Sequence, residues 1–171
     1  MREKPVVAIL MGSQNDLPVV ENSFKIFKEF GIRFEAHVMS AHRTPEDACK
    51  FAKNAEAKGF KVIICVAGMA AHLGGVVAAH TILPVIGLPI ASEPFGGMDA
   101  LLATVQMPPG IPVAAVTSGK AGGKNAALYA ASILALSDAE IAKKLKQFRV
   151  AQTAKVKSAD AELQKHLEEN Y

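Results

Sequence analysis

The chain has 171 residues, of which half are apolar and a fifth charged, and its formal net charge is +3. This length is typical of one domain covering residues 1–171, and the small excess of positive charge does not indicate a nucleic-acid partner. The mean hydropathy is positive, so we expect part of the apolar surface to be covered by other subunits.

The beginning of the chain carries no targeting signal that we recognise. Residues 1–5 lead directly into an apolar segment, without the apolar region and cleavage site of a signal peptide, and no run of about 18 uncharged apolar residues occurs. We therefore expect a cytoplasmic protein that does not bind a membrane. Cys49 and Cys65 fall in a predicted helix and a predicted buried strand, with neither metal-ligand nor disulfide spacing, and we expect both to be core thiols.

The first half of the chain alternates between predicted strands and helices. A strand at about residues 5–11 is apolar throughout, which is typical of a strand covered on both faces. A helix follows from about Leu17 to a C-cap at Gly31. Residues 33–39 then alternate between apolar and polar side chains, which favours a strand near the edge of a sheet and leaves His37 half-exposed.

The next helix has a clear start signal. Thr44 is a hydroxyl N-cap, Pro45 suits the first helical position, and the acids Glu46 and Asp47 suit the first turn; Gly59 ends the helix. A third strand at about 61–67 and a helix at about 72–81 follow, and short strands are predicted at 84–89 and 111–116.

The second half ends in two further helices. Residues 125–136 are small and apolar almost all round, which indicates a buried or subunit-contacting helix. Residues from about 138 to 168 form an amphipathic helix with apolar positions at helical spacing and a solvated basic face. Its basic residues are Lys143, Lys144, Lys146, Arg149, Lys155 and Lys157, and its apolar residues are Ile141, Leu145, Phe148, Val156, Leu163 and Leu167. The order of elements predicts an α/β protein with a parallel sheet of about five strands and helices on both faces.

Three predicted strands lead into loops of small and polar residues. These loops are residues 12–16, with the sequence GSQND, residues 40–44, with SAHRT, and residues 68–72, with GMAAH. Because the carboxyl ends of neighbouring parallel strands meet at one crevice, we expect a hydroxyl, a carboxylate, two imidazoles and a guanidinium to gather there.

Individual residues in these loops suggest chemistry but leave alternatives open. Gly12 and Ser13 precede a helix, which suits either a phosphate or an ordinary turn capped by Asp16. His42 can exchange a proton near neutral pH and Arg43 can hold a phosphate or carboxylate, although the pair also fits a surface turn. His72 is either catalytic or a helix cap, whereas His80 and His166 are expected to be structural residues on helices.

Common nucleotide-binding motifs are missing from the expected places. No G-x-G-x-x-G follows the first strand, and residues 118–125 resemble a P-loop but lack its first glycine and its magnesium-binding hydroxyl. A phospho-acceptor domain would need acidic residues where Gly12 and Ser13 stand. A flavodoxin-like module that binds FMN fits the fold and remains the non-enzyme alternative, although neither Tyr129 nor Tyr171 lies on these loops to stack on a flavin.

Five segments together resemble the PurE family, the catalytic subunits of phosphoribosylaminoimidazole carboxylase. They are MGSQND at 11–16, SAHRTP at 40–45, AAHL at 70–73, VQMPPGIPV at 105–113 and GKAGGKNAALYAA at 119–131. The similarity is greatest to the bacterial N5-carboxyaminoimidazole ribonucleotide mutases. It implies a three-layer αβα, flavodoxin-like fold and an isomerase of de novo purine biosynthesis that moves a carboxylate from the exocyclic nitrogen of its substrate to ring carbon C4, without metal, ATP or another cofactor.

The resemblance also implies roles for particular residues. His42 matches the general acid/base, while Ser13, Asp16 and Arg43 match contacts to the phosphate and ribose, with Gly12 beside them. Ser40 and Ala41 line the same pocket. The loop that closes over the imidazole and the carboxylate is matched by Gly68, Ala70, Ala71, His72 and Leu73.

Two departures favour the alternative of direct carboxylation of aminoimidazole ribonucleotide by CO2. Met69 and Gly74 replace the usual glycine and proline, and residues 92–99 are similar to the direct carboxylases. The matches in the SAHRTP and AAHL segments favour the mutase. The family further implies a homo-octamer with sites between subunits, in which the carboxy-terminal helix packs on a neighbour.

Overall fold

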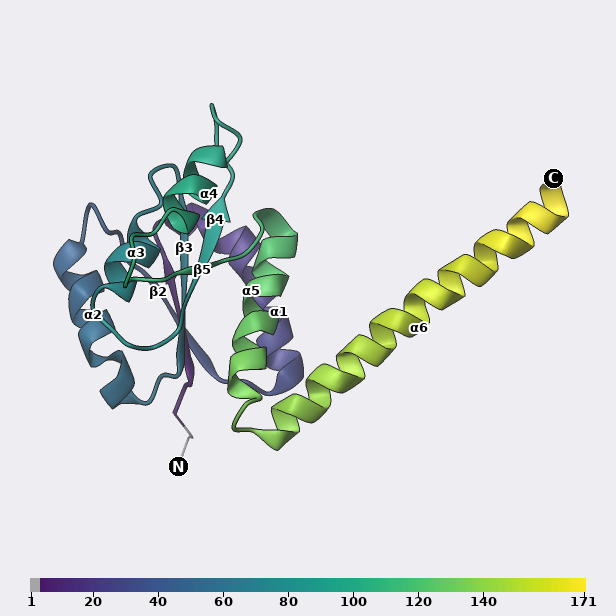
Figure 1. Ribbon diagram of the computed structural model, residues 1–171, viewed down its shortest axis with the longest axis horizontal. Coiled ribbons are helices and arrows are strands. Elements are labelled where there is room, and N and C mark those ends of the chain that lie inside the picture. Colours follow the sequence, from purple (N-terminus) through teal and green to yellow (C-terminus); the bar gives the residue numbers. More distant parts are fainter. Residues whose placement is uncertain (1–3) are drawn as a thin grey trace.

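The computed structural model describes residues 4–171 and has at its centre a five-stranded parallel sheet (Figure 1). The strand order is β2-β1-β3-β4-β5. The strands are β1 (Val7–Met11), β2 (Phe34–Val38), β3 (Val62–Gly68), β4 (Val85–Ile90) and β5 (Ala114–Ala115). Met1, Arg2 and Glu3, on which the expectation about the amino terminus partly rests, lie outside the described residues.

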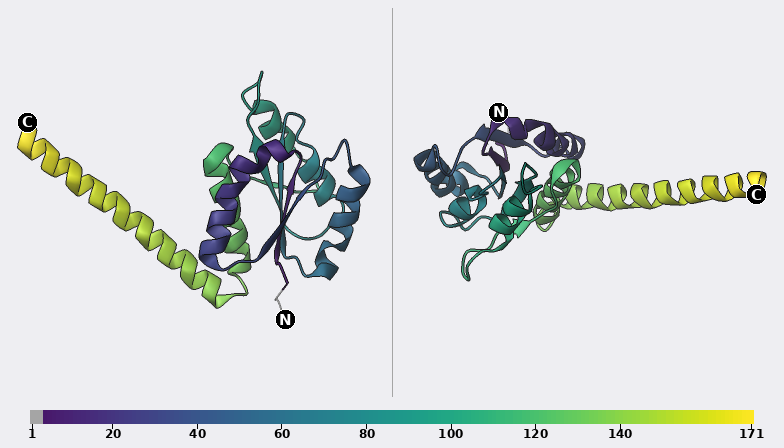
Figure 2. Two further views of the ribbon diagram at one scale, coloured as in Figure 1. Left: turned by 180° about the vertical axis from the view of Figure 1, so that it is seen from behind. Right: turned by 90° about the horizontal axis from the view of Figure 1, so that it is seen from above.

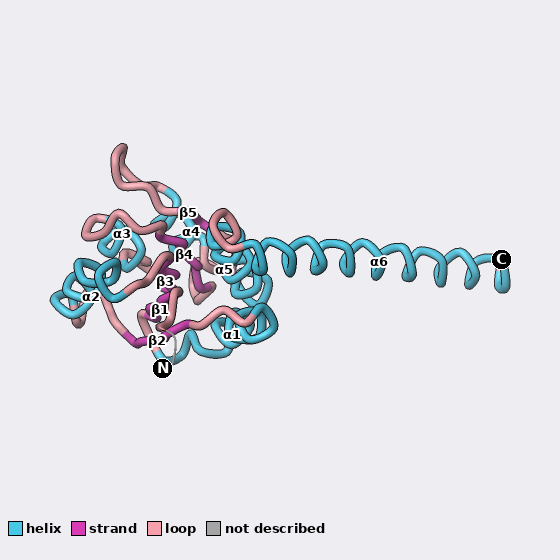
Figure 3. Tube along the Cα trace, turned by 90° about the horizontal axis from the view of Figure 1, so that it is seen from below, coloured by secondary structure: helices cyan, strands magenta, loops and turns pink. Residues whose placement is uncertain are grey.

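Helices cover both faces of this sheet (Figures 2 and 3). They are α1 (Leu17–Phe30), α2 (Pro45–Lys58), α3 (Leu73–Ala78), α4 (Met98–Val105), α5 (Gly119–Leu134) and α6 (Ala139–Asn170), and a short 3-10 helix, η1 (Gln14–Asp16), precedes α1. Nowhere in residues 4–171 is there a helix with the length and apolar character needed to cross a membrane. The three-layer αβα architecture predicted from the sequence is confirmed.

The core lies in two layers because successive side chains of a strand point to opposite faces. Ile9 and Ile64 belong to the layer packed against α1 and α5, whereas Leu10 and Ile63 belong to the layer packed against α2 and α3. The residues of β1 are buried throughout, and those of β2 are only partly buried because this strand lies at the sheet edge. Both observations agree with the patterns in the sequence.

The α1 and α5 helices pack closely because α5 presents very small side chains to α1. A Cβ atom on Gly123 would lie 2.3 Å from the carbonyl oxygen of Val19 in α1. The buried Ser23 hydroxyl donates to the carbonyl oxygen of Gly123 at 2.6 Å, which joins the two helices at the same point. The expectation of a buried, alanine-rich helix is confirmed, but α5 begins at Gly119 rather than near Asn125.

Several other boundaries differ from the predictions. The third helix ends at Ala78 instead of continuing to about 81, so His80 lies beyond it, and the Nδ1 atom of His80 hydrogen-bonds the carbonyl oxygen of Val76 at 2.8 Å. The fifth strand has only two residues, and α4 is a helix that the sequence analysis did not predict. Gly87 allows α4 to approach β4, because a Cβ there would lie 2.2 Å from a methyl carbon of Thr104.

One predicted cap is wrong in its chemistry. Thr44 occupies the N-cap position of α2, but its hydroxyl makes no capping bond to the helix. It instead accepts a hydrogen bond from the backbone N–H of Ser40 at 3.0 Å and donates to the Ser40 carbonyl oxygen. The hydroxyl therefore closes the loop before the helix.

The two cysteines lie on α2 and on β3, as expected, and both are free. Cys65 is buried in the core, but Cys49 is only partly buried, so the expectation of a core thiol is wrong for Cys49. Burial in the apolar core raises the pKa of the Cys65 thiol, so this side chain stays protonated at neutral pH. The thiol of Cys65 therefore belongs to the packing of the sheet.

The α6 helix extends far from the rest of the molecule (Figures 1 and 2). At its beginning, Ile141, Leu145 and Phe148 pack against the core. Lys144, expected on the solvated face, donates from Nζ to the carbonyl oxygen of Phe30 at the end of α1. Further along, the predicted apolar positions Val156, Leu163 and Leu167 are exposed.

Candidate functional site

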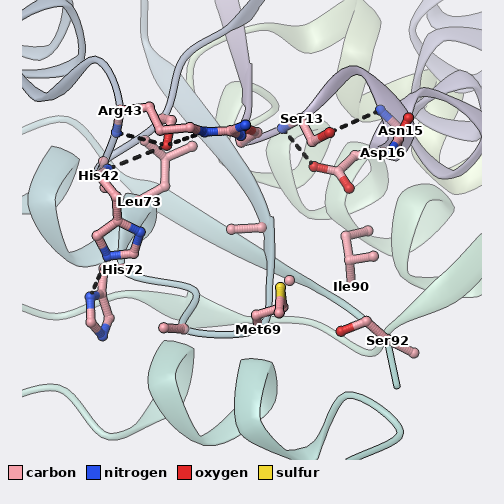
Figure 4. A pocket seen from close by; sticks show the side chains of 17 residues that line it. Ser13, Asn15, Asp16, His42, Arg43, Met69, His72, Leu73, Ile90 and Ser92 are labelled. Atoms are coloured by element: carbon pink, nitrogen blue, oxygen red, sulfur yellow. Dashed lines mark hydrogen bonds between the residues drawn. The ribbon is translucent and has the colours of Figure 1, made fainter. Parts of the chain in front are cut away.

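A cavity of about 780 Å³ opens at the carboxyl ends of β1, β2, β3 and β4 (Figure 4). All of the site residues predicted from the sequence line this cavity except Ala71. Those that line it are Gly12, Ser13, Asp16, Ser40, Ala41, His42, Arg43, Gly68, Ala70, His72 and Leu73. Loops far apart in the sequence therefore meet here, as the parallel topology predicts.

The β1 loop is held by a reciprocal pair of hydrogen bonds at the start of η1. The Ser13 hydroxyl accepts from the backbone N–H of Asn15 at 3.2 Å, and the Asp16 carboxylate accepts from the backbone N–H of Ser13 at 3.1 Å. Asp16 is nearly buried, and its desolvation raises the pKa of its carboxyl group, an effect partly offset by the Ser13 N–H. The loop thus fixes a hydroxyl and a carboxylate on the cavity wall.

Ser40 organises the β2 loop. Its hydroxyl oxygen accepts hydrogen bonds from the backbone N–H groups of His42 and Arg43, at 3.3 and 3.2 Å, and from the Arg43 side chain at 3.4 Å. The Nη2 atom of Arg43 donates to the carbonyl oxygen of Gly12 at 2.7 Å. Arg43 therefore connects the β1 and β2 loops and brings a permanent positive charge to a place suited to an anion.

The two loop histidines contact each other. His42 Nε2 lies 2.9 Å from His72 Nδ1, and the rings meet edge to face at a centroid distance of 4.9 Å. One nitrogen must donate and the other accept, so the bonded pair holds one proton between these two atoms. His72 occupies the N-cap position of α3 but makes no capping bond with its side chain. The helix-cap interpretation of the His72 side chain is therefore wrong.

The β3 loop turns sharply between Gly68 and His72. The backbone N–H of Ala71 donates to the Met69 carbonyl, and that of His72 donates to the Ala70 carbonyl. Met69 has a φ of 54°, a conformation that non-glycine residues rarely adopt. This turn buries the Ala71 side chain, which is only 3% exposed, and keeps it out of the cavity lining. Ala71, which the resemblance places in the loop over the imidazole and the carboxylate, therefore does not present its side chain to this cavity.

The β4 loop contributes residues that sequence reasoning missed. Besides Asn15, Ala67 and Met69, the additional lining residues are Ile90, Ala91 and Ser92. The signal was present in the sequence, because Ser92 follows an apolar strand just as the residues of the other three loops do. Residues 118–125, which resemble a P-loop, form the start of α5 and do not line this cavity.

The polar groups of the cavity suit an anionic organic ligand. Arg43 and the Ser13 hydroxyl offer donors, Asp16 offers an acceptor for hydroxyl groups, and the histidine pair offers a proton. Within residues 4–171, no group of three or more histidine, cysteine, aspartate or glutamate side chains has the arrangement of a metal site.

Comparison with known proteins extends these observations. The sequence profile of the family described as AIR carboxylase matches residues 6–155. A Pyrococcus horikoshii protein named N5-carboxyaminoimidazole ribonucleotide mutase is 50% identical over 167 residues, which cover 98% of this chain and 91% of the relative. An Escherichia coli protein of the same name is 47% identical over 150 residues, covering 88% of this chain and 89% of the relative. The crystal structure of Treponema denticola PurE matches with a TM-score of 0.84 and 34% identity, covering 94% of this chain and 99% of that one.

Proposed function

The chain belongs to the AIR carboxylase family, and from this premise we propose that it catalyses the N5-carboxyaminoimidazole ribonucleotide mutase reaction of purine biosynthesis. The enzyme is thus an isomerase that produces 4-carboxy-5-aminoimidazole ribonucleotide. The observation that carries this conclusion is the identity of about half of all residues, along nearly the whole chain, with proteins that bear this name. Because the chain belongs to this family, we no longer consider the alternative of an FMN-binding module.

The reaction requires protonation of the exocyclic nitrogen and, later, removal of the proton from ring carbon C4. We assign both steps to His42: its imidazolium protonates the exocyclic nitrogen as the bond from nitrogen to the carboxyl carbon breaks, which releases CO2. Ring carbon C4 then attacks this CO2, and the C4 proton returns to His42 as the ring regains aromaticity. Atoms and charge balance, and general acid–base catalysis of this kind typically contributes about 10²- to 10⁴-fold in rate.

His72 is placed to assist His42 through the hydrogen bond between the two rings. A neutral His72 that accepts from His42 fixes the orientation of the catalytic ring, and it supports the positive charge that His42 carries before it protonates the substrate. We therefore assign His72 a positioning role.

Confinement of CO2 is the second task of the site. Apolar side chains from the β3 and β4 loops, including Ala70, Leu73 and Ile90, form one wall of the cavity. Such a wall excludes the water that would hydrate CO2, and it keeps the gas beside the ring. Effective molarities for well-oriented intramolecular reactions reach about 10⁵ M or more.

The remaining polar residues suit the ribonucleotide. Ser13 and Arg43 are assigned to the phosphate, and Asp16 to the ribose hydroxyls. Gly12 lies beside them and accepts the Arg43 hydrogen bond with its carbonyl oxygen. Ser40 holds the loop that presents Arg43, and Ala41 lies beside it on the cavity wall. Gly68 leaves room where the β3 loop passes the β4 strand, because a Cβ there would lie 3.2 Å from the Ile90 carbonyl oxygen.

We also propose that the enzyme works in the cytoplasm as a homo-octamer. Two exposed apolar surfaces support assembly. On α4, the side chains of Met98, Leu102 and Val105 are each about half exposed. The second surface lies on the outer part of α6. Surfaces of this kind on a chain with positive mean hydropathy favour contacts between subunits.

Two separate assays of the purified protein, without ATP or added metal, test the proposal. One supplies N5-carboxyaminoimidazole ribonucleotide, and the other supplies aminoimidazole ribonucleotide with CO2. We expect rapid conversion of N5-carboxyaminoimidazole ribonucleotide. Efficient carboxylation of aminoimidazole ribonucleotide by CO2, with slow use of the first substrate, would instead establish the direct carboxylase. Failure to use either substrate would contradict both activities.

A further inference from the structure

The β4 loop places a serine hydroxyl against the apolar wall of the cavity. In the sheet, Gly68 of β3 pairs with Ile90 of β4, so the chains that continue from these residues leave the sheet next to each other. Ser92 therefore lies beside residues 69–72, the loop that we propose lies over the reacting groups of the substrate. Figure 4 shows its side-chain oxygen directed toward Met69.

Polar side chains are scarce on this side of the cavity. The lining residues contributed by β3, β4 and their loops are Ala67, Gly68, Met69, Ala70, His72, Leu73, Ile90, Ala91 and Ser92. Of these, His72 and Ser92 carry polar side chains, and His72 Nδ1 already bonds His42. Ser92 thus supplies the single hydroxyl of this wall.

The Ser92 hydroxyl is buried and its hydrogen-bonding capacity is unused. Among the residues that the structure describes, none forms a hydrogen bond with its oxygen. Asp99 Oδ1, at the start of α4, is also buried without a hydrogen-bond partner, but Asp99 does not line the cavity. A buried hydroxyl without a partner weakens a fold, and the buried hydroxyl of Ser23, by comparison, is bonded to the Gly123 carbonyl oxygen.

On the basis of the proposed function, we propose that the Ser92 hydroxyl donates a hydrogen bond to the carboxylate that migrates during the reaction. The phosphate and ribose already have partners on the β1 and β2 loops, so the carboxylate is the remaining anionic group that needs a donor. A hydrogen bond to a charged acceptor in an apolar, water-poor wall is stronger than an average one. Met69 is 62% exposed, so its flexible side chain is free to move away from Ser92 when the nucleotide enters.

Two nucleotides that differ in the carboxylate alone test this contact. The dissociation constants of aminoimidazole ribonucleotide and of 4-carboxy-5-aminoimidazole ribonucleotide are measured by calorimetry for the wild-type enzyme and for Ser92→Ala. We expect the variant to bind the carboxylated nucleotide roughly 10-fold more weakly or worse, the loss typical of a hydrogen bond to a charged group. Its affinity for the nucleotide without a carboxylate should stay within about 2-fold of wild type, because surface and cavity contacts to the common part are retained.

A matched serine variant separates binding from stability. Ser23→Ala removes a bonded hydroxyl far from the cavity, and it should lower the melting temperature without changing either affinity. Ser92→Ala should leave the melting temperature of the free protein unchanged or higher, since it removes an unpartnered hydroxyl. An equal loss of affinity for both nucleotides, no loss for either, or a melting temperature lowered as much as in Ser23→Ala would each overturn the assignment. Wild-type protein that binds neither nucleotide would instead contradict the proposed function.

Discussion

At the scale of single residues, the site depends on short polar side chains that hold longer ones. Ser40 accepts three hydrogen bonds within its loop and so fixes the positions of His42 and Arg43. In the neighbouring loop, the Ser13 N–H fixes the Asp16 carboxylate and the Asn15 N–H fixes the Ser13 hydroxyl. The geometry of the proposed site is therefore set before a substrate arrives, which is the condition under which positioned groups accelerate a reaction.

Replacing His42 with asparagine tests the assigned acid and base. His42→Asn retains a polar side chain of similar reach but cannot carry the proton, so we expect kcat to fall by about 10²- to 10⁴-fold. The melting temperature and the affinity for the carboxylated nucleotide should remain near those of wild type, because the ring is exposed and packs on His72 alone among the described rings. Steady-state kinetics with thermal unfolding measure both effects, and near-normal turnover would remove His42 from its role.

Asp16 predicts a dependence of stability on pH. Burial raises the pKa of its carboxyl above the ordinary value of 3.8, so the folded protein binds the proton more tightly than the unfolded chain does. Its contribution to the free energy of unfolding is therefore greatest below pH 3.8 and is lost as the pH rises through the raised pKa. Asp16→Asn, which keeps an acceptor for the Ser13 N–H, should be more stable than wild type at pH 7 and equal to it at acidic pH.

Thermal unfolding of the two proteins from acidic to neutral pH checks this expectation. Binding of the ribonucleotide should be weaker in the variant, because a neutral amide replaces the carboxylate assigned to the ribose. A variant less stable than wild type at neutral pH would show that the Ser13 bond outweighs the cost of burying the charge.

At the scale of helices and strands, glycines allow neighbouring elements to pack closely. Gly87 lets α4 approach β4, and Gly123 lets α5 approach α1. These contacts align the carboxyl ends of β1 and β4 with the helices that follow or cover them.

A methyl group at Gly123 should disturb this packing. Gly123→Ala brings a Cβ to 2.3 Å from the Val19 carbonyl oxygen, a backbone atom that cannot rotate away. We expect the free energy of unfolding to fall by about 3 kcal/mol, in the upper range for overpacking. Chemical denaturation measures the loss, and Lys124→Ala, at the adjacent exposed position of α5, should change stability by less than about 0.5 kcal/mol. Equal stability of Gly123→Ala and wild type would mean that α1 and α5 pack less closely than described.

At the scale of the whole molecule, α6 is the element without a complete partner. The apolar stripe that begins with Ile141, Leu145 and Phe148 against the core continues along the same helix face to Val156 and Leu163, which are exposed in the single chain. A helix that ends in such a stripe is more stable when another chain covers it. This supports the proposed assembly, in which the helix contacts a neighbouring subunit.

A charge placed in the stripe should weaken that assembly. Leu163→Glu buries a carboxylate in the proposed contact, whereas Ala161→Glu adds the same charge on the opposite face of the helix. Light scattering coupled to size-exclusion chromatography should give an octamer for wild type and Ala161→Glu, and smaller species for Leu163→Glu. An unchanged mass for Leu163→Glu would exclude this part of α6 from the subunit contact.

The sequence by itself determined the parallel sheet, the edge position of β2, the caps at Gly31 and Gly59 and the gathering of three loops at one cavity. These features follow from patterns within one element or from the general topology of alternating strands and helices, and the motifs in the loops identified the family. Local patterns also located His42 and Arg43, because both lie in the short loop between β2 and α2.

Only the tertiary structure decided what depends on contacts between distant segments. It brought His72 Nδ1 into hydrogen-bond contact with His42, buried the Ala71 side chain and paired the Thr44 hydroxyl with the backbone of Ser40. It also formed α4, whose position depends on packing against Gly87. No periodicity within a segment encodes these outcomes, since each depends on which side chains the folded sheet brings within a few ångströms of one another.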